Sequence, residues 1–267
     1  MPDFYAHYSQ GQKVFAILPQ KVLNAVSNKN LYNLGLQGPD FLYFHRPLKK
    51  ENNPVLQLAD DIHKMSCAFF LNRVLEKVAV SESTDEFSYL MGFIGHFGLD
   101  SEAHPYVNEK VDELHFDHAE MEIEFDKFLL AQDGLSPLRY KAHKHISITK
   151  TEAEAVTKIY SAVLSQVKLE NIYNSFLGFK RGKHFFYAPN RIFQGLRFAL
   201  LKITGLYDTL QGHVMKTNSN PKSGITNKEL FILYNNSVTI TARLMNNFYE
   251  HITQNIPLPQ RFNRAFE

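Results

Sequence analysis

The chain has 267 residues, of which 44% are hydrophobic, and this is enough for a substantial core. Its net charge is only +2, so any affinity for phosphate must come from a local site rather than from an overall field. The single cysteine, Cys67, excludes a disulfide framework within the chain. Because Cys67 lies in the largely apolar segment KMSCAFFL, we expect a buried, unreactive thiol.

The sequence has no evident targeting or membrane-spanning segment. The N-terminal residues MPDFYAHYSQGQ lack the basic and long apolar regions of a signal peptide. No apolar run approaches the roughly 20 residues that a transmembrane helix needs. We therefore expect a cytoplasmic protein.

Helical patterns begin near the N-terminus. The first covers residues 6–26, where Pro19 is expected to kink the helix or to start a new turn. A Gly-Pro pair at residues 38–39 then breaks the chain directly before Asp40. Apolar residues near helical spacing predict the next helix over residues 54–78.

Two further predicted helices occupy the middle of the chain. The first covers residues 84–103, with Ser83 or Thr84 as its N-cap. Pro105 is expected to end this helix, because proline disfavours the helical conformation of the residue before it. The second covers residues 117–132.

The remaining part of the chain is also helical in pattern, with few alternating strand patterns and no internal repeat. After a connection at residues 135–150, a helix begins at Thr151, with Glu154 in capping-box spacing. Further helices fit residues 168–179, 189–204 and 226–254. We predict an all-α fold, a single-domain multi-helix bundle over residues 1–267.

Histidines and acids recur at four-residue steps between residues 96 and 122. His96 and Asp100 are one helical turn apart, as are His118 and Glu122, so each pair shares a helix face. His104 follows Asp100 by the same step. A helix offers a nitrogen and an oxygen to one metal ion in this way.

Three more candidate ligands precede this set: His7, Asp40 and His63. Each has a simpler explanation on its own, because a lone helical histidine is more often a core or surface residue and Asp40 is placed to cap a helix. Glu122 is equally explained as one of several solvated acids in EMEIEFD. The repeated pairing makes a metal site about as well supported as these explanations. Imidazole and carboxylate ligands without thiolate suit zinc, and manganese or iron would also accept them.

The number of ligands indicates the chemistry. Eight side chains exceed what one tetrahedral zinc ion needs, and they suffice for two or three ions with positions open to water and substrate. Adjacent divalent ions stabilise phosphoryl and leaving oxygens and lower the pKa of a bound water. The predicted chemistry is metal-assisted hydrolysis of a phosphoester.

The ordered motifs resemble the bacterial zinc-dependent phospholipase C family, whose all-helical fold is shared with fungal single-strand nucleases. The matching pieces, within residues 1–130, are His7, Gly38-Pro39-Asp40, His63, His96–Asp100, His104 before Pro105, and His118–Glu122. The helical remainder at residues 151–255 fits only loosely.

This resemblance implies a role for each matched residue. The residues implied around one zinc ion are Asp40, His63, His96 and Asp100, and those implied around a second are His104, His118 and Glu122. His7 and a bridging Asp100 would contribute to a third zinc ion, and Asp40 would be the general base nearest the attacking water. The chain departs from the family at one point: secreted members use a mature N-terminal Trp at the third zinc, whereas this sequence has no Trp and starts with Met1-Pro2.

We therefore expect a zinc-dependent phosphodiester hydrolase acting on a phospholipid headgroup or a related phosphoester small molecule. Two alternatives stay open: a nuclease or phosphomonoesterase with the same metal centre, and a non-catalytic metal-binding protein. The complete ligand set argues against the last. Residues 179–191, FKRGKHFFYAPNR, combine basic and aromatic side chains that suit a membrane surface or a single-stranded nucleic acid, although an ordinary interhelical loop is the favoured interpretation.

Overall fold

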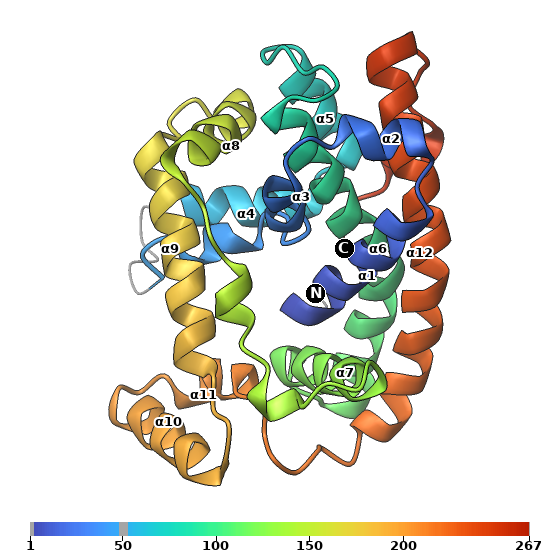
Figure 1. The fold of residues 1–267 in the computed structure, drawn as a ribbon. Coiled ribbons are helices and arrows are strands. Elements are labelled where there is room, and N and C mark those ends of the chain that lie inside the picture. Colours follow the sequence, from blue (N-terminus) through green and yellow to red (C-terminus); the bar gives the residue numbers. More distant parts are fainter. Residues whose placement is uncertain (1–2, 48–52, 267) are drawn as a thin grey trace.

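A computed structural model describes residues 3–47 and 53–266 of the chain, and in these residues it contains α-helices and short 3₁₀ helices but no strand (Figure 1). The first half comprises α1 (Phe4–Ile17), α2 (Gln20–Ala25), α3 (Lys29–Gly35), the 3₁₀ helix η1 (Asp40–Phe44), α4 (Pro54–Lys64), α5 (Cys67–Leu75), α6 (Asp85–Leu114) and α7 (His118–Gln132). The second half comprises η2 (Pro137–Arg139), η3 (Ala142–His145), α8 (Lys150–Val163), α9 (Leu169–Phe186), α10 (Arg191–Ile203), α11 (Tyr207–Leu210), η4 (Gln211–His213), α12 (Ser223–Gln254) and η5 (Gln260–Asn263).

The all-α prediction is confirmed, but two long predicted helices are each divided. The pattern at residues 6–26 forms α1 and α2, which begins directly after Pro19. The pattern at residues 54–78 forms α4 and α5, because Ser66 adopts an extended backbone and its side chain accepts a hydrogen bond from the Phe69 amide. Local capping thus overrides a continuous apolar pattern.

The predicted capping box was wrong by two residues. The structure places it at Thr149 and Glu152, where both reciprocal hydrogen bonds are present, rather than at Thr151 and Glu154. Both pairs have the same spacing, so the sequence pattern did not separate them. The N-cap at Thr84 is confirmed, since its hydroxyl accepts from the Phe87 amide.

Pro105 does not end a helix, contrary to the prediction. It lies inside α6, which continues to Leu114. An internal proline costs about 3 kcal/mol, but α6 is the central helix of the fold and is buried along most of its first two-thirds. Its packing outweighs that cost, and His104 consequently continues the helix face that carries His96 and Asp100.

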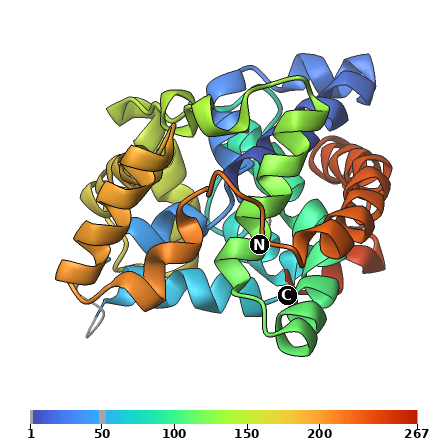
Figure 2. The ribbon, with the colours of Figure 1, turned by 90° about the horizontal axis from the view of Figure 1, so that it is seen from below.

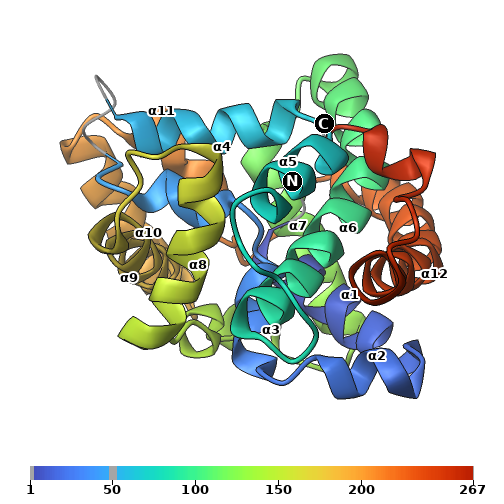
Figure 3. The ribbon, with the colours of Figure 1, turned by 90° about the horizontal axis from the view of Figure 1, so that it is seen from above.

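The close crossing of α3 and α6 determines where the following segment lies. A Cβ atom added to Gly92 on α6 would lie 2.0 Å from the carbonyl oxygen of Tyr32 on α3, so the two backbones touch where only glycine fits. α6 also packs against α1 and α12 at the centre of the molecule (Figures 1 and 3). The chain leaving α3 therefore begins η1 directly beside the middle of α6.

The buried apolar residues form two large clusters and one small one. α6 contributes to both large clusters, through Phe93 and Phe97 in one and Leu99 and Val107 in the other. This shared helix supports the single domain over residues 1–267, which stays a prediction. Cys67 is fully buried, as expected. Among the described residues, no helix is long and apolar enough to cross a membrane.

Candidate metal centre

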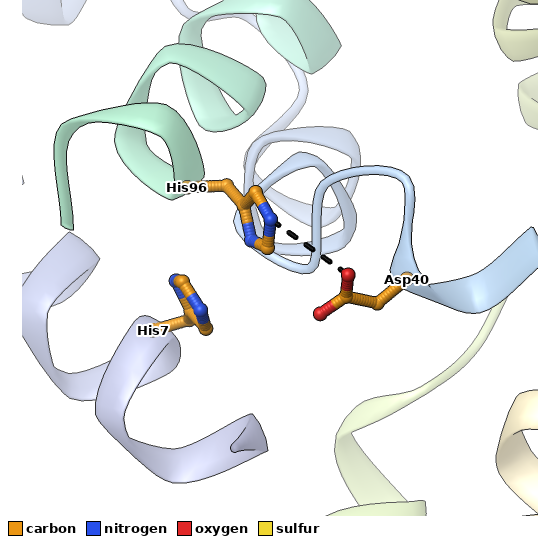
Figure 4. Close-up of side chains that lie close together, drawn as sticks. All are labelled: His7, Asp40 and His96. Carbon is orange, nitrogen blue, oxygen red and sulfur yellow. Dashed lines mark ion pairs between the residues drawn. The ribbon is translucent and has the colours of Figure 1, made fainter. Parts of the chain in front are cut away.

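The eight predicted ligands come from five elements. The donors are His7 on α1, Asp40 on η1, His63 on α4, His96, Asp100 and His104 on α6, and His118 and Glu122 on α7. Figure 4 shows three of them, His7, Asp40 and His96, directed toward one another from separate elements. Residues separated by almost a hundred positions thus meet in one place.

A glycine places Asp40 at this centre. Gly38 has a φ of +47°, and a Cβ atom there would lie 2.2 Å from Cδ2 of His96, so the turn fits against the imidazole only without a side chain. The Gly38 carbonyl accepts hydrogen bonds from the hydroxyls of Tyr89 at 3.3 Å and Tyr160 at 3.2 Å. The turn before Asp40 is therefore held from two helices, α6 and α8.

Asp40 does not act as a helix cap, so that alternative explanation was wrong. Pro39 occupies the cap position of η1, and this helix start has no side-chain cap hydrogen bond. Oδ1 of Asp40 instead lies 3.2 Å from Nε2 of His63 and 3.8 Å from Nε2 of His96. The carboxylate is thus directed at two imidazoles.

Asp100 is the second carboxylate among the histidines. Its Oδ2 lies 2.9 Å from Nε2 of His96, and its Oδ1 lies 3.2 Å from Nε2 of His7. Two sets of three donor atoms lie within 4.8 Å of one another: one from His7, Asp40 and His96, the other from His63, His96 and Asp100. His96 belongs to both sets, so the two candidate ion positions are adjacent.

The donor atoms are buried but poorly satisfied. Several side-chain atoms here are buried and have no hydrogen-bonded partner. They are both nitrogens of His7, Oδ1 of Asp40, Nε2 of His96, both oxygens of Asp100 and both nitrogens of His104. Burying polar groups without compensation is unfavourable, and for a charged group strongly so. Nitrogen and carboxylate oxygen atoms converging in this way form a donor set that fits zinc.

Contacts on the outer side of two histidines orient their inner nitrogens toward the centre. Nδ1 of His63 lies 2.8 Å from the Ala59 carbonyl oxygen, and Nδ1 of His96 lies 3.3 Å from that of Leu36. A carbonyl only accepts, so Nδ1 carries the hydrogen in both rings and Nε2 presents its lone pair to the centre. This arrangement is typical of metal-binding histidines.

The electrostatics of the centre favour the forms that bind metals. Burial lowers the pKa of His104 to about 2, and burial together with the neighbouring His96 lowers that of His7. Burial acts to raise the pKa of Asp100, but the surrounding histidines His96, His7 and His104 hold it well below its usual value. The neutral forms of His7 and His104 are therefore favoured beside an ionised Asp100.

The pKa of His63 is shifted in the opposite direction to those of His7 and His104. Burial acts to lower the pKa of His63, but the neighbouring carboxylate of Asp40 outweighs burial and raises it. The pKa shifts of His63 and His7 are opposite although each ring lies 3.2 Å from a carboxylate oxygen, because burial and the neighbouring His96 dominate at His7.

The remaining three candidates lie at one side of this centre. Nε2 of His118 lies 2.7 Å from Oε1 of Glu122, and the rings of His104 and His118 are 6.0 Å apart. Nε2 of His104 is 3.9 Å from Oδ1 of Asp100, which connects the two regions. Within the described part of the chain, His104, His118 and Glu122 do not form a set of donors within 4.8 Å. The family resemblance departs from the sequence at the N-terminal ligand of the third zinc, and Met1 and Pro2 lie outside the described residues.

His118 and Glu122 are also positioned by their helix start. The Asp117 side chain accepts from the Glu120 amide and caps α7, so that His118 is its first residue. His118 is 42% exposed along its side chain, whereas Glu122 is 12% exposed and is therefore not one of several freely solvated acids.

Two residues near the centre were not predicted from the sequence. Phe266 is fully buried, its ring lies 5.8 Å from that of His63 and 6.0 Å from that of His96, and its amide donates to the His63 carbonyl. Asp126 on α7 accepts from the amides of Tyr5 at 2.7 Å and Ala6 at 2.8 Å, which anchors the first turn of α1 beside His7. Neither position has a local sequence signal, because each acts on a segment far away in the chain.

The aromatic residues after Asp40 divide between two roles. Phe41 is fully buried and stacks on Phe176, so it belongs to the core. The Tyr43 hydroxyl donates to Oδ1 of Asp60 at 2.8 Å, and its ring stacks against His63 at 5.8 Å. Tyr43 therefore supports one of the candidate ligands.

Comparison with known proteins agrees with the donor set. The family model for zinc-dependent phospholipase C matches residues 6–171, which is well over half of the chain and includes all eight candidate ligands. Neither a curated protein nor a solved structure matches the chain. The family resemblance drawn from the motifs and the all-helical fold are thereby confirmed. The chain belongs to the zinc-dependent phospholipase C family, and its enzymatic class is that of a phosphodiesterase.

Proposed function

We propose that the chain hydrolyses the phosphodiester bond of a phospholipid headgroup at a centre of two or three zinc ions. The observation that carries this proposal is the convergence of buried imidazole nitrogens and carboxylate oxygens that have no hydrogen-bonded partner. Family membership supports zinc dependence and a phospholipid substrate. The assignment of ions to residues is our proposal.

The donor set divides among the ions as follows. Asp40, His63, His96 and Asp100 would hold one zinc, and His104, His118 and Glu122 a second. His7 and Asp100 would contribute to a third. When bound, such ions polarise a phosphoryl oxygen and lower the pKa of water.

The two carboxylates nearest the histidines have different roles in this proposal. Asp100 is fully buried and ionised, so its oxygens are suited to holding ions and unsuited to exchanging a proton with water. The Asp40 side chain keeps 14% exposure, so water reaches it. Asp40 therefore accepts the proton of the attacking water as general base, and the bonds from Tyr89 and Tyr160 to Gly38 hold it in place.

The variant Asp40→Asn tests this role. It keeps the shape of the side chain but removes the basic oxygen, so we expect kcat to fall by about 100- to 10,000-fold while the helical fold is retained. The matched control is Asp61→Asn, which changes an exposed acid on the same helix as His63 whose carboxylate accepts a hydrogen bond from the Gln57 side chain. A variant that keeps both its zinc content and its rate would remove Asp40 from the active site.

The substrate class is tested separately on the wild-type protein. A monomeric short-chain phosphatidylcholine, a chromogenic phosphodiester, the corresponding monoester and single-stranded DNA are compared at equal zinc content. Preferential cleavage of the phospholipid supports the proposal. Preferential cleavage of the monoester or the DNA would instead assign the same centre to a phosphomonoesterase or a nuclease.

A further inference from the structure

α10 exposes an unusual number of large apolar side chains. Eleven such side chains are exposed in the described part of the chain, and five of them belong to this one helix. The five are Ile192 at 74%, Phe193 at 43%, Leu196 at 57%, Leu200 at 43% and Ile203 at 83% exposure. Single exposed apolar residues need no explanation, but a contiguous group indicates an interaction surface.

The five side chains form a stripe on the outer face of α10. At 100° per residue, they fall within an arc of about 100°. The buried residues of the helix, Gln194 and Leu201, lie on the opposite side. The apolar stripe therefore points away from the protein, which is the reverse of what packing onto a core requires.

The surrounding sequence carries only positive charge. Residues 171–207 contain no Asp or Glu, although the whole molecule has a net charge of only +2. Their six cationic residues are Lys180, Arg181, Lys183, Arg191, Arg197 and Lys202. By helical geometry, Arg191 and Lys202 lie on one side of the stripe and Arg197 on the other. The segment 179–191 is an interhelical loop only at residues 187–190, because α9 continues to Phe186 and α10 begins at Arg191.

The helix lies at an edge of the molecule but is linked to the metal centre. Figures 1 and 2 show α10 on the side opposite α12, beyond α9. Through α11 the chain passes to η4, which packs on α7 so closely that a Cβ added to Gly212 would lie 2.0 Å from Oδ1 of Asp117. α7 carries His118 and Glu122. The α10 surface is thereby connected to this side of the candidate centre through α11, η4 and α7.

We propose that α10 is a docking helix for a bilayer that contains anionic phospholipid. Its apolar stripe enters the boundary between headgroups and acyl chains, and the flanking Arg191, Arg197 and Lys202 contact the anionic headgroups. The cationic residues Arg191, Arg197 and Lys202, with no acid between residues 171 and 207, favour this occupant over a second copy of the chain, which would bring like charges together. The inference rests on the proposed function, because a phospholipid substrate brings the enzyme to a bilayer.

Vesicle binding tests the proposal independently of catalysis. Cosedimentation of the full-length zinc-loaded protein is measured with phosphatidylcholine vesicles with and without phosphatidylserine. We expect binding that increases with phosphatidylserine and decreases with salt. The double variant Ile192→Gln/Ile203→Gln should weaken vesicle binding by about tenfold for each apolar side chain that is removed from the interface.

Matched controls come from α12. Ile225 is 65% exposed and Ile232 is 53% exposed, so Ile225→Gln/Ile232→Gln removes the same residue type from another surface and should leave vesicle binding unchanged. Hydrolysis of a monomeric short-chain phospholipid should be unchanged by the α10 variant, whereas hydrolysis of vesicles should fall. Vesicle binding without any hydrolysis would contradict the proposed function and leave the docking helix supported.

Three results would overturn the docking proposal. The first is a wild-type protein that does not bind vesicles of either composition. The second is an equal loss of binding in the α10 and α12 variants. The third is sedimentation of the wild type as a dimer that the α10 variant dissociates, with vesicle binding unaffected, which would assign the stripe to a second copy of the chain.

Discussion

The close contact between Gly38 and His96 leads to a specific prediction for Gly38→Ala. The new Cβ would lie 2.2 Å from the His96 ring, where an ordinary contact needs at least 3.4 Å, so the ring or the turn must move by about 1 Å. His96 belongs to both donor sets, and the same turn carries Asp40. A displacement of this size at a reacting centre lowers the rate by about 100-fold. We therefore expect that loss in kcat on a soluble phosphodiester, together with a lower zinc content.

The positive φ of Gly38 requires a control that separates backbone strain from the clash. Gly134 has a φ of +71°, and a Cβ added there meets nothing within 4 Å. Gly134→Ala should therefore cost about 1–2 kcal/mol of stability, from the left-handed backbone alone, and leave zinc content and kcat unchanged. If Gly38→Ala matches Gly134→Ala in zinc content and kcat, the contact with His96 does not position the centre.

Three further predictions concern the elements that surround the centre. His118→Ala should remove about one zinc per chain by elemental analysis, because His118 is one of the three proposed ligands of one ion, beside His104 and Glu122. The His118 side chain is 42% exposed, so the helical circular dichroism spectrum should not change, and an unchanged zinc stoichiometry would exclude it as a ligand. Asp126→Ala should lower the free energy of unfolding in urea by about 2–5 kcal/mol, because two buried amides lose their acceptor, and Asp126→Asn should recover part of this loss. A loss of less than ~1 kcal/mol, smaller than the ~1–3 kcal/mol expected for even one unsatisfied group, would contradict the anchoring role. In the zinc-free protein, the pKa of His104 is lowered from 6.5 to about 2, so the unfolded chain binds more protons below pH 6.5. His104 alone should lower the free energy of unfolding by about 2 kcal/mol from pH 7 to pH 5, and equal urea midpoints at the two pH values would refute this.

Local rules made much of the helical content and the ligand pairs predictable. Residues four apart on a helix share a face in any protein, so His96 with Asp100 and His118 with Glu122 were paired by spacing alone. Thr84 was identifiable as a cap because capping involves only the next few residues. These features depend on short stretches of chain, and the structure contains them where the spacing placed them.

The path of α6 through Pro105 was not predictable in the same way. Proline acts locally to end a helix, whereas burial along most of α6 keeps this one continuous. Whether burial is sufficient depends on α1, α3 and α12, which are distant in the sequence. The prediction failed because tertiary packing outweighed a local preference.

By itself, the sequence determined the helical class, the residue types of the donor set and their order along the chain, because periodicity and motif spacing are written in consecutive residues. Only the tertiary structure decided that Gly38 meets His96, that Phe266 packs behind His63, and that the apolar stripe of α10 points outward. An apolar stripe has the same spacing whether it faces a core or solvent. Which of these occurs depends on contacts between segments far apart in the chain, and those exist only in the folded molecule.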